Sequence, residues 1–306
     1  MVTAETEATA SLPSSRSARL GVLFFVVAPP IGLILAIWLA WGNGVYALDI
    51  GQLIFWHTIT GLGVTVGFHR LFTHASFKTS APVKAVLGIL GSMTIQGNLF
   101  KWCAVHMKHH SHSDKEGDPH SPHAYGKGFW AVWRGFWHAH FGWLFSHEMT
   151  HSEMDKQTKR FRKEPLLVWI DRFFLLWVVL GLAFPSLIGW LFTGTWEGAL
   201  RGFLWGGIIR VGTVHHATWS INSVCHIWGR KDFRSDDQSR NNWIFGILGW
   251  GEGWHNGHHA FLWSAKHGLL RWQIDPSWWI IKTMSWLGLA RDIKVPTPSQ
   301  IEKERS

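Results

Sequence analysis

Long apolar stretches constrain the fold of this chain more than any other feature of its sequence. The first runs from Leu20 to Trp41 without a charged residue, and about 20 apolar residues suffice to cross a bilayer as a helix. Comparable stretches cover residues 46–68, 166–192 and 196–219. We therefore expect an all-α integral membrane protein, with four transmembrane helices arranged as two hairpins.

The composition agrees with a membrane protein that also has a substantial polar part. Charged residues make up only 16% of the 306 residues, against roughly 25% in soluble domains, and the 23 tryptophans suit the interface between membrane and water. The net charge is +9, but the basic residues are scattered among apolar segments. This distribution favours membrane lipids as partners and speaks against nucleic acid.

The placement of Lys and Arg predicts the orientation. The short connections at residues 42–45 and 193–195 contain neither residue, so by the positive-inside rule the other connections and both termini are cytoplasmic. We expect a multi-pass protein of the cell membrane in a bacterium, or of the endoplasmic reticulum membrane in a eukaryote. The expected parts are a mobile N-terminus (1–19), a membrane domain (20–290) whose cytosolic cap comes from residues 70–165 and 220–290, and a mobile tail (291–306).

Clustered histidines carry most of the functional information. An H-x-x-H-H motif occurs twice, at His106–His110 and at His255–His259, and the pair His69 and His74 follows the second apolar stretch. Within each triplet, offsets of three and four residues place the rings on one face of a helix. His69 and His74 differ, because five residues rotate a regular helix by about 500° and leave the rings roughly 140° apart. This pair requires an unwound helix end or separate metals.

The number of clustered imidazoles indicates a pair of metal ions. Eight histidines exceed the four ligands of a closed zinc site, and neither cysteine lies in a cluster. Imidazole binds Zn, Cu, Fe and Ni alike, so the ligand type does not choose among these metals. Neutral ligands favour carboxylates nearby. The candidate carboxylates are Asp114, Glu116, Asp118, Asp236, Asp237 and Glu252.

These motifs resemble the membrane fatty-acid desaturase family, specifically the delta-9 acyl desaturases of the stearoyl-CoA desaturase type. The resemblance covers about residues 45 to 290, and the segment Ser264 to Leu269 is most similar to the bacterial and cyanobacterial branch. The matching segments are Gly67 to His74, His106 to His110, Asp118 to His120, Ala217 to Trp219, Asn222 to His226 and Gly251 to His259.

The resemblance implies a cytosolic cap that holds two ferrous ions. It supplies a ninth histidine ligand, His226, and an asparagine, Asn222, that reaches a metal through water. The implied metal ligands are His69, His74, His106, His109, His110, His226, His255, His258, His259 and Asn222. The resemblance further implies a kinked tunnel for the acyl chain, with its bend near Gln96, Trp102, Thr218 and Trp219.

One departure from the family leaves the acyl donor open. Acyl-CoA members carry charged residues just before the second cluster, whereas this chain has Cys103, Ala104 and Val105. The donor is then an acyl-CoA, an acyl-lipid or an acyl-carrier protein. The His-Pro-Gly-Gly haem motif of a fused cytochrome b5 does not occur in the sequence. We therefore expect electrons from a separate carrier, such as a ferredoxin or cytochrome b5 with its reductase.

The sequence thus predicts an oxidoreductase that uses O2 to introduce a cis double bond, at delta-9 according to the resemblance, into a saturated acyl chain. Breaking an unactivated methylene C–H bond requires a redox metal, which zinc is not. Two alternatives remain open. One is a diiron membrane hydroxylase or ketolase, which adds oxygen to its substrate. The other is a membrane protein that binds or transports metal without catalysis.

Overall fold

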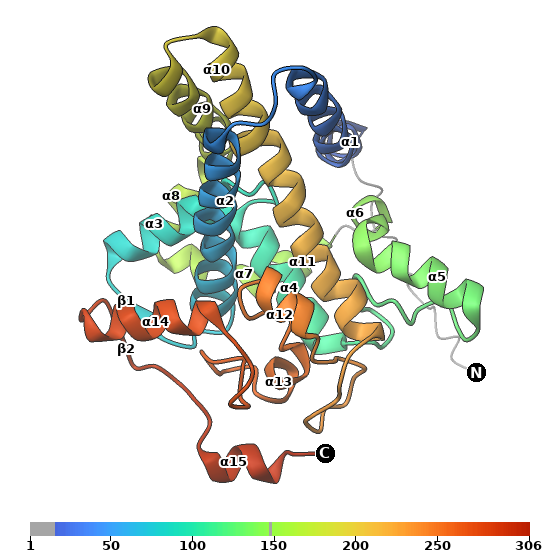
Figure 1. Cartoon of the computed structure of the whole chain (residues 1–306). Coiled ribbons are helices and arrows are strands. Elements are labelled where there is room, and N and C mark those ends of the chain that lie inside the picture. Colours follow the sequence, from blue (N-terminus) through green and yellow to red (C-terminus); the bar gives the residue numbers. More distant parts are fainter. Residues whose placement is uncertain (1–15, 147–148) are drawn as a thin grey trace.

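The computed structural model describes residues 16–146 and 149–306, and these residues are mostly helical (Figure 1). The α-helices are α1 (Arg16–Ala40), α2 (Ala47–Leu62), α3 (Ala81–Ser92), α4 (Leu99–His112), α5 (Phe129–Trp137), α6 (Trp143–Ser146), α7 (His151–Thr158), α8 (Pro165–Arg172), α9 (Phe174–Thr193), α10 (Trp196–Gly202), α11 (Arg210–Ile227), α12 (Trp243–Leu248), α13 (His255–Ala260), α14 (Pro276–Trp286) and α15 (Pro298–Lys303). The other elements are the π-helices η1 (Gly63–Thr73), η2 (His138–Gly142) and η4 (Phe203–Ile209), the 3₁₀ helix η3 (Phe161–Lys163), and the antiparallel strands β1 (Lys78–Thr79) and β2 (Ala290–Arg291).

Two helices are long and apolar enough, by length and composition, to cross a membrane: residues Leu20–Ala40 of α1, and α9. Both expose large apolar side chains, as lipid-facing helices do and the core helices of soluble proteins do not. The other two predicted spans are divided between α-helical and π-helical segments. The mostly helical fold is therefore confirmed, and two of its helices have the length and composition of a membrane span. The prediction of four transmembrane helices is not confirmed.

The third predicted span begins later than the sequence suggests. The expected stretch of residues 166–192 is broken at Phe173, and α9 starts only at Phe174. The segment before the break, α8, instead buries Leu167 and Ile170 against α3 and α4. The indole of Trp177 donates to the carbonyl of Ile170 (3.0 Å) and so satisfies a backbone group near the break. The charged residues Asp171 and Arg172 stand directly before this change in direction.

Buried arginines tie the long helices together. Arg201 of α10 pairs with Asp49 of α2, with Nε 3.2 Å from each carboxylate oxygen, and both side chains are buried. Arg210 at the start of α11 is wholly buried and donates to the backbone carbonyls of Met93 (2.6 Å), Gly181 (2.7 Å) and Gly206 (3.0 Å). Each guanidinium therefore has the acceptors that burial of a charge requires.

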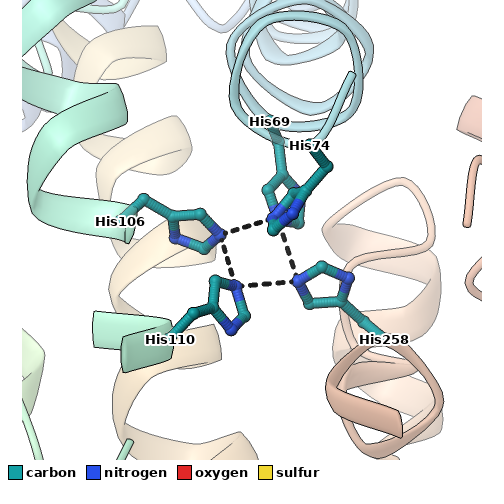
Figure 2. Close-up of side chains that lie close together, drawn as sticks. All are labelled: His69, His74, His106, His110 and His258. Atoms are coloured by element: carbon teal, nitrogen blue, oxygen red, sulfur yellow. Dashed lines mark hydrogen bonds between the residues drawn. The ribbon is translucent and has the colours of Figure 1, made fainter. Parts of the chain in front are cut away.

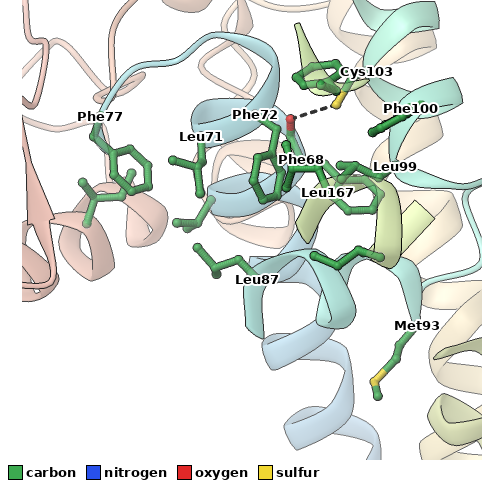
Figure 3. Close-up of a cluster of buried hydrophobic side chains, with 14 of the residues drawn as sticks. Phe68, Leu71, Phe72, Phe77, Leu87, Met93, Leu99, Phe100, Cys103 and Leu167 are labelled. Atoms are coloured by element: carbon green, nitrogen blue, oxygen red, sulfur yellow. Dashed lines mark hydrogen bonds between the residues drawn. The ribbon is translucent and has the colours of Figure 1, made fainter. Parts of the chain in front are cut away.

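An apolar core fixes η1 against α3, α4 and α8 (Figure 3). Phe68 and Leu99 are fully buried in it, and the thiol of Cys103 lies 3.6 Å from the carbonyl oxygen of Phe68. The backbones of η1 and α3 approach so closely that a Cβ on Gly63 would lie 2.3 Å from the backbone nitrogen of Gly91. This packing sets the position of the C-terminal end of the second predicted span.

The C-terminal residues 291–306 do not match the predicted mobile tail. Strand β2 pairs with β1, and the amide of Ala265 donates to the carbonyl of Lys294 (2.8 Å). Farther along, the amide of Arg234 donates to the carbonyl of Glu304 (2.7 Å). Backbone hydrogen bonds of this kind cannot be read from the polar composition on which the prediction rested. Of the predicted mobile N-terminus, residues 1–15 lie outside the described residues, and Arg16 begins α1.

The Arg201–Asp49 pair provides a test of this packing. Replacing Asp49 with Ala leaves a buried guanidinium without its carboxylate, which costs about 3–5 kcal/mol of stability. We expect the thermal unfolding midpoint of the detergent-solubilised protein, followed by circular dichroism, to fall. The double variant Asp49→Leu/Arg201→Met removes both charges and should recover most of the loss. A single variant that is no less stable than the double variant would show that the pair does not hold α2 to α10.

Candidate metal centre

Nine histidines converge in two adjacent groups. We call the first the five-histidine group and the second the four-histidine group, and the possible ligand atoms within each lie within 4.8 Å of one another. The five-histidine group comprises His69, His74, His106, His110 and His258. The four-histidine group comprises His109, His226, His255 and His259. Figure 2 shows the rings of the five-histidine group pointing toward one another from η1, α4 and α13.

Each H-x-x-H-H motif is shared between the two groups. On α4, His106 and His110 belong to the five-histidine group, whereas His109 belongs to the four-histidine group. On α13 the division is reversed: His258 belongs to the five-histidine group, whereas His255 and His259 belong to the four-histidine group. Adjacent residues on a helix point about 100° apart, so each helix supplies both groups from one broad face. The rings of each triplet are therefore divided between the two groups.

A π-helix brings His69 and His74 together. The amide of His74 donates to the carbonyl of His69 (3.0 Å), which is the i→i+5 bond of a π-helix, and the ring centroids lie 4.8 Å apart. Residues five apart, which diverge on an α-helix, share one side of this wider helix. The sequence required an unwound helix end or separate metals, and η1 meets that requirement while remaining helical.

Four of the candidate carboxylates contact Nδ1 of a clustered histidine. The Nδ1–oxygen distances are 2.5 Å for His69–Glu252, 3.0 Å for His109–Asp118 and 2.8 Å for His226–Asp114, and Asp237 contacts Nδ1 of His259 in the same way. The contacts of the described residues include none from Glu116 or Asp236 to these rings. In each of these four contacts the carboxylate accepts a hydrogen bond from Nδ1–H of the imidazole. The Nε2 atom of that ring then keeps its lone pair, which is directed into the histidine group.

The charge states of these groups follow from their surroundings. Burial alone raises the pKa of the Asp114, Asp118 and Glu252 carboxyl groups, but the adjacent histidines outweigh burial and lower each pKa. Burial, together with the neighbouring rings, holds the pKa of His255 and His258 well below the usual value. The rings of His255 and His258 are therefore neutral near pH 7, as metal coordination requires.

The separations between Nε2 atoms fit ligands of a shared ion. They are 3.1 Å for His69–His258, 2.8 Å for His106–His110 and 3.0 Å for His226–His255. Two ring nitrogens that each lie about 2.1 Å from one ion and at right angles to each other are about 3.0 Å apart. Lone pairs that face one another in a buried site also need a cation between them. The two groups can therefore hold metal ions, although their all-imidazole donors do not specify which metal.

Three buried residues support the centre without belonging to either group. Arg70, wholly buried, donates from Nε to Glu252 (3.3 Å) and also bonds Asp275. His267 lies with Nδ1 3.3 Å from Glu252, and the ring of His120 lies 4.4 Å from that of His109. The sequence analysis gave none of these three a role, although each stands within a segment that carried the resemblance.

Two connected cavities lie beside the histidines. The outer cavity, of about 280 Å³, is lined by Gln96, Trp102, Thr218 and Trp219, the four residues expected at the bend of a tunnel. Three of them form a chain, since Trp102 Nε1 donates to Gln96 Oε1 (3.1 Å) and Gln96 Nε2 donates to Thr218 Oγ1 (2.9 Å). The inner cavity, of about 50 Å³, shares with the outer one the lining residues Trp102, His106, Thr218 and Asn222.

Asn222 lies at this junction of the cavities and outside both histidine groups. His69 and His106 of the five-histidine group and His255 of the four-histidine group line the inner cavity. A chain-like molecule that filled both cavities would therefore pass directly beside both groups. The expected roles of Asn222 and of the four residues at the bend stay predictions.

Comparison with known proteins identifies similar chains. The model of the fatty acid desaturase family matches residues 45–282. A hex-5-enoyl-[acyl-carrier protein] acetylenase of Moorena producens (strain JHB) is 42% identical over 285 residues, which are 92% of this chain and 88% of that protein. An sn-1 stearoyl-lipid 9-desaturase of Anabaena variabilis is 36% identical, covering 83% and 86% of the two chains. An acyl-CoA C20 Delta5-desaturase of Anemone leveillei is 37% identical, covering 79% and 72%.

The division into two groups predicts how metal content responds to substitution. Replacing His109 with Ala removes a ligand from the four-histidine group alone, so we expect the purified protein to lose about half of its bound metal, as measured by inductively coupled plasma mass spectrometry. His112, an exposed residue on the same helix, supplies the matched control, and His112→Ala should retain the full content. Undiminished metal in a folded His109→Ala variant would rule out this ring as a ligand.

Proposed function

The chain belongs to the fatty acid desaturase family, and we propose that it uses a diiron centre and O2 to place a cis double bond, at delta-9, in a saturated acyl chain. Membership of the family, with relatives named as desaturases, makes it an oxidoreductase that acts on fatty-acyl chains. One observation carries the proposal furthest: both groups of buried histidines border the junction of two cavities that could hold a chain. This supports the desaturase over the non-catalytic alternative.

Iron is the metal we propose for the two groups. Removal of hydrogen from a methylene group needs one-electron chemistry, and zinc has none. Two bound iron ions would supply the activation of O2 that this reaction requires. The proposed ligands are the nine clustered histidines, with Asn222 reaching a metal through water. The neutral imidazoles and the four carboxylates bonded to them support this assignment, because carboxylates fix the ring orientation and raise ligand basicity.

The chain's own residues have three further proposed tasks. The hydrogen-bonded chain Gln96–Trp102–Thr218 would hold the acyl chain at its bend, so that two adjacent carbons face the histidine groups. Trp219 would form the neighbouring wall of the outer cavity. The apolar lining would exclude water from the reacting carbons. Packing at a bend favours the cis geometry of the product.

For the topology, we propose four transmembrane spans with the histidine centre and both termini on the cytoplasmic side. The exposed apolar surfaces of α1 and α9 support two of these spans. The other two would be the rods formed by α2 with η1 and by α10, η4 and α11, whose buried charges have protein partners. Electrons would come from a separate ferredoxin or cytochrome b5, which the basic cytoplasmic segments suit electrostatically.

The acyl donor and the type of bond formed need direct measurement. The printed names of three relatives specify an acyl-carrier protein, a lipid and a CoA ester as donors, so family membership allows each. We propose an acyl-lipid or an acyl-CoA. The acetylenase, at 42% identity, favours a second candidate function, in which this chain removes two hydrogens from an existing double bond to form a triple bond.

Expression in a host that lacks its own desaturase tests the proposed function. We expect new fatty acyl chains lighter by two hydrogens, with a cis bond located by gas chromatography–mass spectrometry. His109→Ala should abolish this product while the protein still inserts into membranes, and His112→Ala should not. Because these enzymes activate O2, product should also disappear under anaerobic growth. Chains that gain one oxygen would instead identify a hydroxylase.

The acetylenase alternative predicts a different response to substrate. When the same host is supplied with a monounsaturated acyl chain, an acetylenase would convert it to a chain with a triple bond, whereas a delta-9 desaturase would leave it unchanged. We expect the saturated chain to be the better substrate by at least about tenfold in competition, since a site shaped around two adjacent methylene groups discriminates against a chain that lacks them at that position. A preference for the monounsaturated chain would reverse the order of the two candidates.

A further inference from the structure

The inner cavity is much smaller than the outer one. One wall comes from α2 and η1, through Gly61, Val64 and Thr65, and the opposite wall comes from α11. Its volume of about 50 Å³ leaves room for roughly four groups of the size of a water molecule or a methylene. Trp250, which also lines this cavity, comes from a separate segment, the turn that follows α12.

Trp250 packs closely against α2 and has a strained backbone conformation. Its φ of 51° lies in the left-handed region, which a bulky side chain rarely adopts. The indole contacts His57, with ring centroids 4.5 Å apart and the ring planes tilted by 42°. It also lies so close to Gly61 that a Cβ on this glycine would be 2.3 Å from the indole Cη2 atom. Gly61 therefore leaves the space that the indole occupies.

The surrounding structure holds this tryptophan in place. The carbonyl of Trp250 accepts a hydrogen bond from the amide of Ser277 (3.1 Å), which lies in the first turn of α14. Its partner His57 is held in turn by Thr213 of α11, with Nδ1 3.0 Å from the hydroxyl oxygen. Backbone strain persists only where the surroundings enforce it, and it concentrates at functional sites. Here the strained residue directs its indole against His57 and Gly61 of α2.

We propose that Trp250 is the end wall of the acyl tunnel and sets the length of the substrate on its methyl side. The proposal rests on the proposed function, since it takes the inner cavity as the place of the methyl end beyond the reacting carbons. The acyl donor enters from the outer cavity, where exposed Lys101 lies on the lining. The substrate class is then an acyl chain with a short segment, of about four carbons, beyond the junction of the two cavities.

Replacing Trp250 with Gly tests this assignment. Glycine accepts the positive φ without strain, and loss of the indole extends the inner cavity between α2 and α11. One misfitting methylene in an apolar pocket changes relative turnover by about tenfold or more. We therefore expect Trp250→Gly to raise, by at least about tenfold, the ratio of products with two further carbons on the methyl side to the wild-type products. Mass spectrometry of total fatty acyl chains, with the double bond located chemically, measures this ratio.

Two further variants make the result specific. Trp243, an exposed tryptophan that begins α12, provides the matched control, and Trp243→Ala should leave the product ratio unchanged. In the Trp250→Gly background, Gly61→Leu returns bulk to the vacated space from the opposite side, and it should restore the wild-type ratio. Trp250→Phe, which keeps an aromatic ring and so protects the fold, should shift the ratio in the same direction by a smaller amount.

The outcomes separate this inference from the proposed function. If the wild-type chain makes no unsaturated product at all, the proposed function fails. If it does, and Trp250→Gly or Trp250→Phe retains metal and activity with an unchanged distribution of chain lengths, Trp250 is not the end wall. A shift that Gly61→Leu does not reverse would likewise overturn the assignment, because it would show that the cavity beside Gly61 does not set the length.

Discussion

The contact between a buried imidazole and a buried carboxylate is the interaction on which this structure depends. Nine imidazoles with their Nε2 atoms turned toward one another would be unfavourable unless something fixed their orientation and a cation shared their lone pairs. Glu252, Asp114, Asp118 and Asp237 fix the orientation by accepting from Nδ1. Both histidine groups contain rings held in this way. The fold therefore orients ring nitrogens of each group as possible metal ligands before any metal binds.

Long-range connections then hold those carboxylates. Glu252 contacts a ring on η1 from the loop before α13, and Arg70 bonds both Glu252 and Asp275 within the same buried network. Asp114 bonds His226 near the end of α11 and also accepts from the amide of Gln238 (2.8 Å). Four segments far apart in the sequence are therefore joined through polar contacts at one place. The apolar core beneath η1, α3 and α4 supplies the rigid support for that junction.

The sequence predicts the clustering of histidines because the repeated spacing is local, whereas it does not predict geometry that depends on packing. The repeated H-x-x-H-H spacing and the apolar stretches could be read directly from residue types. The five-residue spacing of His69 and His74 excludes a regular α-helix as the way to align the two rings, and a π-helix is one geometry that aligns them. By contrast, the break at Phe173 and the distribution of each triplet over two groups depend on tertiary contacts. The position of Trp250 depends on them as well, because no periodic pattern marks a turn residue as the wall of a cavity.

The arrangement of the two long rods explains how a polar centre can adjoin an apolar tunnel. Both rods contain a π-helical segment, η1 after α2 and η4 before α11, and π-segments are frequent at functional sites. In the first rod the wider helix turns two imidazoles to one side, and every residue of η1 is buried. The α-helical parts on either side keep their apolar residues for packing. A change from α-helix to π-helix alters the direction of the side chains without breaking the backbone hydrogen bonds. One continuous rod can therefore lie in an apolar environment at one end and carry candidate metal ligands at the other.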